Sequence, residues 1–271
     1  GQYKRLANEW TGVLTGKGLS FGGSLIRPEA TGYGDIYFAQ NMLAVNGETF
    51  EGKKCVISGS GNVASFAAEK LMQLGAKVLT LSDRSGAIYV EDGLTEQMLK
   101  DIMVLKNVTR GELADFAKEA KGVKFYAGAN SWQIADKIDA AFPCARQNEL
   151  NGEDADYLLK HGCKLVGEGA NMPSTPEAIE KFLHAKIMFS PGKASNAGGV
   201  ATSGLEMSQN SERLSWSAEE VDNKLKGIMK SIHDNAYEAA AKYGHKGNYV
   251  MGANIAGFVK VADAMVAQGV C

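Results

Sequence analysis

Short apolar runs alternate with helix-length amphipathic segments through the first 200 residues of the chain. The intervening segments carry apolar residues three or four positions apart, which is typical of helices that bury one face. The apolar runs predict strands near residues 55–58, 77–82, 138–144, 164–167 and 186–190, and shorter strands are expected at 86–90 and 124–126. Strands that alternate with helices in this way predict an α/β fold with a doubly wound sheet.

Residues 192–199 are expected to form a loop, and the pattern changes after Gly199, where the strand-like runs stop. Residues 200–213 read as a helix, and Ser217 with Glu220 has the spacing of a capping box that opens another. A last helix is expected over 253–268. The pattern therefore divides the chain into an N-terminal segment (1–21), a sheet domain (22–199) and an all-helical C-terminal tail (200–271).

The stretch from Cys55 to Arg84 has the chemistry of a dinucleotide-binding unit. An apolar run meets a G-x-G-x-x-A turn, a helix follows, and a second apolar run ends at Asp83. Gly59 permits a tight turn, Gly61 has no Cβ to block a pyrophosphate, and Ala64 allows helix and strand to pack closely. A glycine turn often merely joins a strand to a helix, but here the strand, turn, helix, second strand and acid all occur at the spacing that a dinucleotide-binding unit requires. The turn residues Ser60, Gly61, Asn62 and Val63 are the predicted pyrophosphate site.

Composition and charge exclude several other classes of function. The apolar fraction is 45%, the charged fraction 22% and the net charge −2, with no basic run that would indicate nucleic acid or an anionic membrane. No uninterrupted apolar stretch reaches about 18 residues, so no membrane-spanning helix is expected. The first residues resemble no signal peptide and lack an initiator Met. We expect the chain to begin inside a larger protein or after processing.

The four cysteines and four histidines show no metal-binding spacing. Cys55 and Cys144 lie in apolar runs and are interpreted as buried thiols in a reducing cytoplasm. No metal site is predicted. The cytoplasm is the expected location.

Small and amide residues follow the predicted strands, at the edge where ligands bind in such sheets. They include Ala145, Gln147, Asn171 and Asn196. Asn and Gly also favour turns, so none of these positions is decisive alone. Arg27 and Thr31, near a helix start, could hold an anion or an amide, or could be only a surface charge and a cap.

Several of these stretches resemble the glutamate dehydrogenase branch of the amino-acid dehydrogenases. The matching stretches are 22–34, 58–64, 143–145 with 147–149, 168–173, 191–193 with 196–200, 203–210 and 248–265. The resemblance implies a coenzyme-binding Rossmann-like domain over 22–199, with C-terminal helices that return to a substrate domain. It implies that residues 1–21 come from the domain junction. The family's catalytic lysines and aspartate would precede Gly1, so no catalytic residue is expected in this chain.

The resemblance also implies roles for individual residues. Arg27 and Thr31 match positions near the nicotinamide end, and Asn171 and Asn196 match asparagines that hold the nicotinamide ribose and carboxamide. Val200 and Ser203 match positions that line the substrate pocket, although ordinary helix packing explains them equally well. The implied reaction is L-glutamate, NADP and water to 2-oxoglutarate, ammonia and NADPH, in a homo-hexamer. The chain alone would bind dinucleotide without turnover.

The preferred cofactor depends on the end of the second predicted strand. Asp83 alone favours NAD, because a carboxylate there accepts hydrogen bonds from the ribose hydroxyls. Ser82 and Arg84 flank it, and a guanidinium can grip the 2′-phosphate of NADP. Lys106 would add a second positive charge, whereas Glu112 stands where some relatives carry a basic residue. NADP is predicted, with NAD as the alternative. A leucine, valine or phenylalanine dehydrogenase remains a second alternative.

Overall fold

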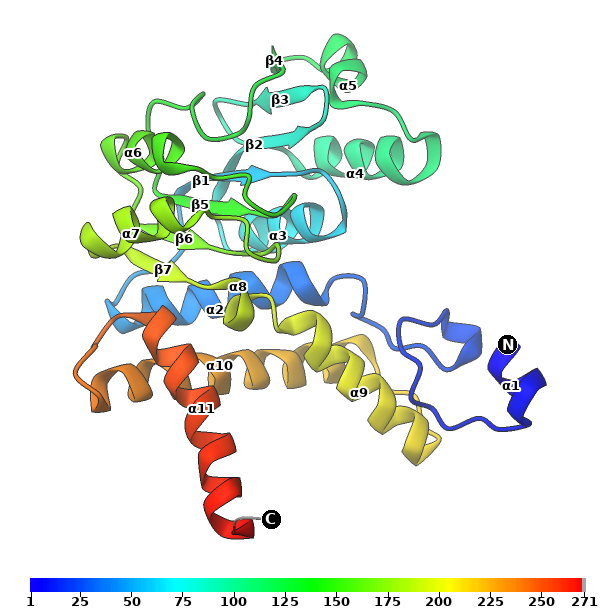
Figure 1. Ribbon diagram of the computed structural model, residues 1–271. Helices are drawn as coiled ribbons and strands as arrows, with labels where there is room; N and C mark the ends of the chain where they lie inside the picture. Colours follow the sequence, from blue (N-terminus) through cyan, green and yellow to red (C-terminus); the bar gives the residue numbers. More distant parts are fainter. Residues whose placement is uncertain (270–271) are drawn as a thin grey trace.

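The computed structural model describes residues 1–269 of the chain (Figure 1). Val270 and Cys271, the end of the predicted helical tail, lie outside the described residues. The helices are α1 (Gln2–Ala7), α2 (Ala30–Val45), α3 (Asn62–Gln73), α4 (Glu96–Val104), α5 (Leu113–Glu119), α6 (Gly152–Lys160), α7 (Pro176–His184), α8 (Gly192–Ser195), α9 (Gly198–Glu212), α10 (Ala218–Lys242) and α11 (Tyr249–Gln268), with a 3-10 turn η1 (Leu19–Phe21) and a π-helical turn η2 (Leu105–Thr109). The strands are β1 (Lys54–Ser58), β2 (Lys77–Asp83), β3 (Gly86–Tyr89), β4 (Lys124–Ala127), β5 (Ala140–Pro143), β6 (Leu165–Gly167) and β7 (Met188–Ser190).

The seven strands form one sheet in the order β4-β3-β2-β1-β5-β6-β7. The five strands β2, β1, β5, β6 and β7 run parallel, while β3 and β4 add an antiparallel edge beyond β2. The chain builds outward from β1 to one side and then returns through β5 to the other. The crevice between the carboxyl ends of β1 and β5 is therefore the switch point at which ligands bind in such sheets.

Alternate residues of the central strands enter two different cores. Cys55 and Ile57 of β1 pack with α2, α3 and α4 on one face of the sheet. Val56 of β1 and Leu79 of β2 pack with α6 and α7 on the other. A strand buried on both faces needs apolar residues at successive positions, which explains the near-continuous apolar run at residues 55–57. The doubly wound prediction is confirmed.

The helical tail is attached to the sheet domain through α2. Phe38 and Met42, on the outer side of α2, pack against Leu225 and Met229 of α10. The predicted capping box opens α10, where Ser217 Oγ accepts from the Glu220 amide and Glu220 caps the Ser217 amide. In Figure 1, α10 runs alongside α2, and α11, drawn in red, extends away from the sheet domain.

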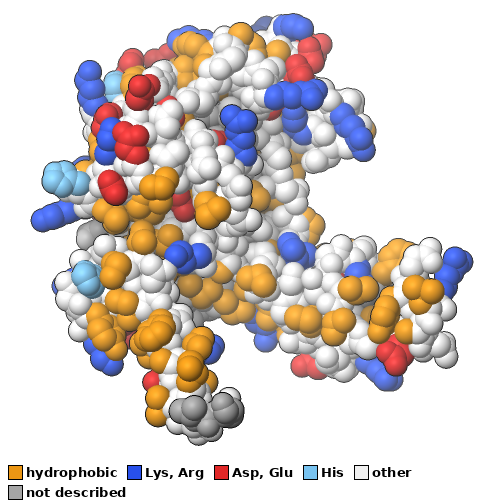
Figure 2. All heavy atoms as spheres, in the orientation of Figure 1, with side chains coloured by type: hydrophobic (Ala, Val, Ile, Leu, Met, Phe, Trp, Pro, Cys, Tyr) orange, Lys and Arg blue, Asp and Glu red, His pale blue; other side chains and the backbone are white. Residues whose placement is uncertain are grey.

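Apolar side chains remain exposed on α11 and along the N-terminal segment. The large exposed ones include Trp10, Phe21, Phe258, Met265 and Val266. Figure 2 shows hydrophobic side chains in orange on the two arms that project from the sheet domain. By length and composition α11 is apolar enough to cross a membrane, whereas the sequence predicted no membrane-spanning helix. One such helix is weak support for a membrane protein, because a helix that packs against another domain has the same composition.

Two local predictions require correction. Residues 192–199 were expected to form a loop, but they contain α8, and α9 begins two residues before its predicted start. Ser195 Oγ donates to the carbonyl oxygens of Glu168 and Pro191, so contacts from a distant strand end fold this small-residue stretch. The bond to Glu168 spans 27 residues and leaves no periodic signal in the sequence.

Candidate functional site

The G-x-G-x-x-A turn joins β1 to the amino end of α3. Gly59 has a φ of 86°, a conformation that favours glycine, and its amide donates to Ser82 Oγ at 2.9 Å. Gly61 is the N-cap of α3 and no side chain caps the helix there. A Cβ at Gly61 would meet nothing within 4 Å. The first amides of α3 are thus available to an anion that approaches through open space.

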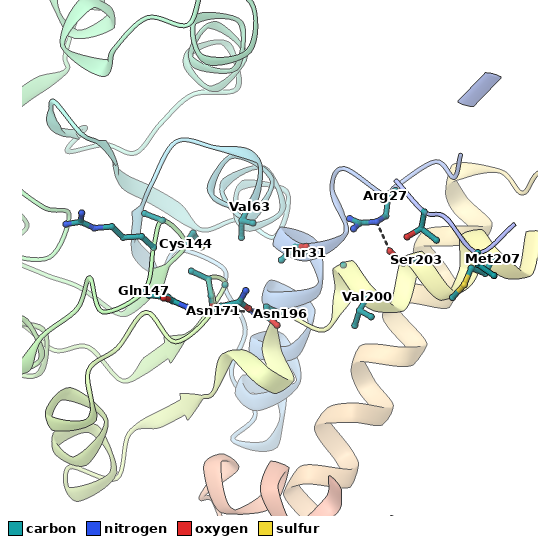
Figure 3. A pocket seen from close by; sticks show the side chains of 17 residues that line it. Arg27, Thr31, Val63, Cys144, Gln147, Asn171, Asn196, Val200, Ser203 and Met207 are labelled. Carbon is teal, nitrogen blue, oxygen red and sulfur yellow. Dashed lines mark hydrogen bonds between the residues drawn. The ribbon is translucent and has the colours of Figure 1, made fainter. Parts of the chain in front are cut away.

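A cavity of about 790 Å³ adjoins this turn at the carboxyl edge of the sheet (Figure 3). It brings together nine predicted residues from distant parts of the chain: Arg27, Thr31, Val63, Ala145, Gln147, Asn171, Asn196, Val200 and Ser203. Ser60, Gly61 and Asn62 belong to the adjoining turn and are not in its lining. Asn62 instead joins the turn to the α2 end, because its side-chain amide donates to the Pro28 carbonyl at 3.1 Å.

Polar contacts orient several of the lining side chains. The amide of Asn196 donates to Asn171 Oδ1 at 2.7 Å and to the Ala170 carbonyl at 3.3 Å. Arg27 Nε donates to Ser203 Oγ at 3.0 Å across 176 residues of sequence, drawn as the dashed line in Figure 3. The cavity therefore offers amide groups on one side and a held guanidinium on the other.

The four residues predicted to select the cofactor lie outside the cavity, around the β2–β3 turn. Ser82 is buried and accepts from the Gly59 amide. Asp83 accepts from Lys106 Nζ at 2.8 Å and from the amides of Ser85 and Leu113. Burial acts to raise the pKa of Asp83, but these hydrogen bonds outweigh it and hold the pKa below its usual value. Asp83 is thus an ionised, internally bonded group.

Arg84 is exposed and paired with an acid. Its Nε donates to Glu112 Oε1 at 2.8 Å, and the Arg84 side chain is 85% exposed. Lys106 also donates to the Gly111 carbonyl at 2.9 Å. Both positive charges predicted for the phosphate are therefore occupied by partners from the chain itself.

Two glutamates, the half-buried Glu149 and the buried Glu168, shape the site, although neither was predicted as a site residue. Glu149 Oε1 accepts from Ser58 Oγ at 2.7 Å and from the amides of Ala145 and Arg146, which fixes the turn that lines the cavity. Glu168 accepts from the amides of Gly192 and Ser174. Burial raises the pKa of both carboxyls, although these hydrogen bonds act in the opposite direction. The sequence signal that could have identified these two residues is an acidic side chain near the end of a predicted strand.

Cys144, Met207 and Val13 also line the cavity without having been selected. Cys144 was interpreted only as a buried thiol. Among the acids, histidines and cysteines of residues 1–269, no group of three or more could hold a metal ion. The groups present are suited to binding a ligand, because amide donors, a guanidinium and a free helix N-terminus are arranged along one crevice.

Comparisons with known proteins agree with this arrangement. Residues 22–269 match the Glutamate/Leucine/Phenylalanine/Valine dehydrogenase family. The NADP-specific glutamate dehydrogenase of Giardia intestinalis is 57% identical over 271 residues, covering 99% of this chain and 60% of the relative. The NAD(P)-specific glutamate dehydrogenase of Xylanibacter ruminicola is 57% identical over 270 residues, covering 100% of this chain and 60% of the relative.

A solved structure extends the similarity to three dimensions. The crystal structure of Plasmodium falciparum glutamate dehydrogenase matches with a TM-score of 0.96 at 45% identity, covering 100% of this chain and 58% of that one. The chain thus spans about 60% of the length of the curated relatives it matches. With its Rossmann-type sheet, its fingerprint turn and a family match over 248 residues (22–269), the chain belongs to the Glutamate/Leucine/Phenylalanine/Valine dehydrogenase family.

Proposed function

We propose that this chain is the coenzyme-binding part of a glutamate dehydrogenase and that its cofactor is NADP(H). The observation that carries the proposal is the uncapped amino end of α3, with open space over Gly61 and the Asn171–Asn196 pair in the adjoining cavity. Pyrophosphate oxygens need amide donors near a positive helix end, and a carboxamide needs amide partners. The residues present fit a nicotinamide dinucleotide.

In the proposed reaction, L-glutamate and water give 2-oxoglutarate and ammonia, reversibly. When bound, the dinucleotide supplies hydride acceptance and donation. The chain's own residues bind and orient: the α3 amides hold the diphosphate, Asn171 and Asn196 hold the ribose and carboxamide, and Arg27 and Thr31 lie at the nicotinamide end. Positioning of this kind lowers the barrier by fixing the distance and the reacting face.

The domain assignments and partners are part of the same proposal. Exposed apolar residues on α11 and in the N-terminal segment support a covering substrate domain, to which the helices after residue 199 would return. We propose that Val200 and Ser203 line the substrate pocket there, that the whole enzyme is a homo-hexamer, and that it is cytoplasmic. With the catalytic lysines of the family outside this sequence, the chain by itself binds without turnover.

NAD use is the second candidate, and one contact favours it. Glu112 pairs with the guanidinium of Arg84 and places a negative charge where the 2′-phosphate would approach. One close relative is named NAD(P)-specific. A chain of this kind would bind both cofactors, with NADP preferred only when Arg84 turns toward the phosphate.

A binding experiment with a matched control tests the proposal. Dissociation constants for NADP(H) and NAD(H) are measured by calorimetry on the chain and on Gly61→Val, whose side chain would occupy the open space over the turn. Binding is expected to weaken at least about a hundredfold with little change in melting temperature. Gly227→Val on α10, where a Cβ also meets nothing within 4 Å, should bind like the parent. A parent chain that binds neither cofactor refutes the proposal.

A further inference from the structure

Asp35 is a buried carboxyl without a hydrogen-bonding partner in the described chain. It lies in the second turn of α2 and is 0% exposed, and neither Oδ1 nor Oδ2 has a partner. Glu168, whose charge acts on Asp35, differs because both of its oxygens accept hydrogen bonds from backbone amides. A buried, unpaired carboxylate is costly, so such a group is retained most easily as a neutral acid.

The carboxyl of Asp35 lies directly behind the cavity wall. A Cβ at Gly169 would be 3.1 Å from Asp35 Oδ2 and 2.6 Å from Cys144 Sγ, and both Gly169 and Cys144 line the cavity. A Cβ at Gly167 would be 2.9 Å from Asp35 Oδ1. The two glycines thus make room for the carboxyl, and the wall between it and the cavity at this point includes the Gly169 backbone and the side chains of Cys144 and Val63.

The charged groups around α2 divide between its two sides. Glu168, after β6, and Cys144, after β5, are the titratable groups that face Asp35, with the Ser195 hydroxyl of α8 nearby. Lys193 of α8 acts on Glu168 and bonds Asn254 of α11. Tyr33 and Tyr37 point away from Asp35 on the helix. The charged groups of α3 and α10 lie beside these two tyrosines, and they are Glu69, Lys70, Asp222 and Lys226.

The charge of the bound ligand can therefore change the protonation state of Asp35. Burial, followed by repulsion from Glu168, raises the pKa of Asp35 to about 8, so the acid is neutral near pH 7. An oxidised nicotinamide ring is positively charged and a reduced ring is neutral. A positive charge that enters the cavity beside a buried carboxyl favours its ionised form.

We propose that Asp35 senses the redox state of the bound cofactor: it releases its proton when the positively charged oxidised ring occupies the cavity and keeps it when the neutral reduced ring does. This inference rests on the proposed function, because it places the nicotinamide in the cavity beside Asn171 and Asn196. Asp35 acts through the cavity wall and is a positioning and selectivity residue. Its consequence is that oxidised cofactor binds more tightly as the pH rises, while the affinity for reduced cofactor stays nearly level.

The test is the ratio of dissociation constants for oxidised and reduced cofactor between pH 6 and pH 9. Because NAD⁺ and NADH lack the titrating 2′-phosphate, they are used beside NADP⁺ and NADPH. Calorimetry in two buffers of different ionisation enthalpy counts the protons released. In the parent the ratio is expected to change about tenfold in favour of the oxidised form, with proton release on binding NAD⁺ but not NADH.

Asp35→Asn should remove both the pH dependence and the proton release while still binding cofactor, and Asp35→Leu provides a second variant if the amide disturbs the fold. Asp92→Asn, an exposed acid remote from the cavity, should behave like the parent. Equal pH dependence in the parent and Asp35→Asn overturns the inference and leaves the proposed function intact. Failure of the parent to bind any dinucleotide overturns both.

Discussion

Replacing Glu112 with Gln is expected to tighten NADP binding and to leave NAD binding nearly unchanged. Glu112 holds Arg84 through a single 2.8 Å contact at the β2–β3 turn, and the rest of the Arg84 side chain is open to solvent. The amide of Gln removes the competing charge without changing the length of the side chain. The guanidinium of Arg84 is then free to turn toward a 2′-phosphate.

The size of the effect follows from the exposure of the pair. An ion pair this open to solvent is worth about 0–1 kcal/mol, so releasing Arg84 costs little. A hydrogen bond between the guanidinium and a phosphate contributes about 1.5–3 kcal/mol. The parent can form the same bond once the pair is broken, so Glu112→Gln gains only the cost of breaking the pair, about 0–1 kcal/mol, which is up to about fivefold in the dissociation constant of NADP. NAD has no 2′-phosphate and gains nothing from this contact.

The assay is calorimetric titration of both cofactors at low and high salt, because a contact between exposed charges weakens as salt rises. Arg84→Ala, alone and combined with Glu112→Gln, completes a double-mutant cycle. Glu119→Gln makes the same change of charge at the other end of α5 and serves as the control. Equal tightening of NAD and NADP, or tightening that persists in the Arg84→Ala background, would refute the reasoning.

Two further predictions concern the stability of the fold. Burial raises the pKa of Asp35 in the folded state to about 8. The contribution of Asp35 to the free energy of unfolding is therefore complete below the unfolded-state pKa of about 4 and is lost as the pH rises toward 8. In urea unfolding, the free energy of unfolding of the parent should fall by up to about 1.4 kcal/mol per pH unit relative to Asp35→Asn across that window. The same pH dependence of the free energy of unfolding in both proteins would contradict this. Gly252→Ala should destabilise the α10–α11 pair by about 1–3 kcal/mol, because its Cβ would lie 2.0 Å from the Ala236 carbonyl oxygen. Gly257→Ala, with nothing within 4 Å on the same helix, should instead stabilise slightly in the same thermal or urea melts, and equal effects at the two sites would contradict the close contact.

The local features of the chain could be predicted because their causes are local. Apolar periodicity gave the strands and most helices, and the Ser217–Glu220 spacing marked the start of α10. The turn from Gly59 to Ala64 needs only its own backbone and the absence of side chains to be recognised. The doubly wound sheet followed from the alternation of strands and helices.

The partners of charged side chains could not be predicted in the same way. Arg84 and Glu112 are 28 residues apart, and Arg27 and Ser203 are 176 residues apart, so only the packing of distant elements brings each pair together. Glu112 was noted as a departure from a basic pattern. Its bond to Arg84, and the balance between NADP and NAD that depends on it, came from the tertiary structure.

By itself, then, the sequence determined the order of the elements, the fingerprint turn and the edge of the sheet at which a ligand would bind. The tertiary structure decided which of those residues share a cavity and what lies behind its wall. Asp35 looks like an ordinary polar residue in a helix, and no pattern indicates that Gly167 and Gly169 enclose it. The physical reason is that burial and hydrogen bonding are properties of the surroundings of a side chain, whereas periodicity and spacing describe only its neighbours along the chain.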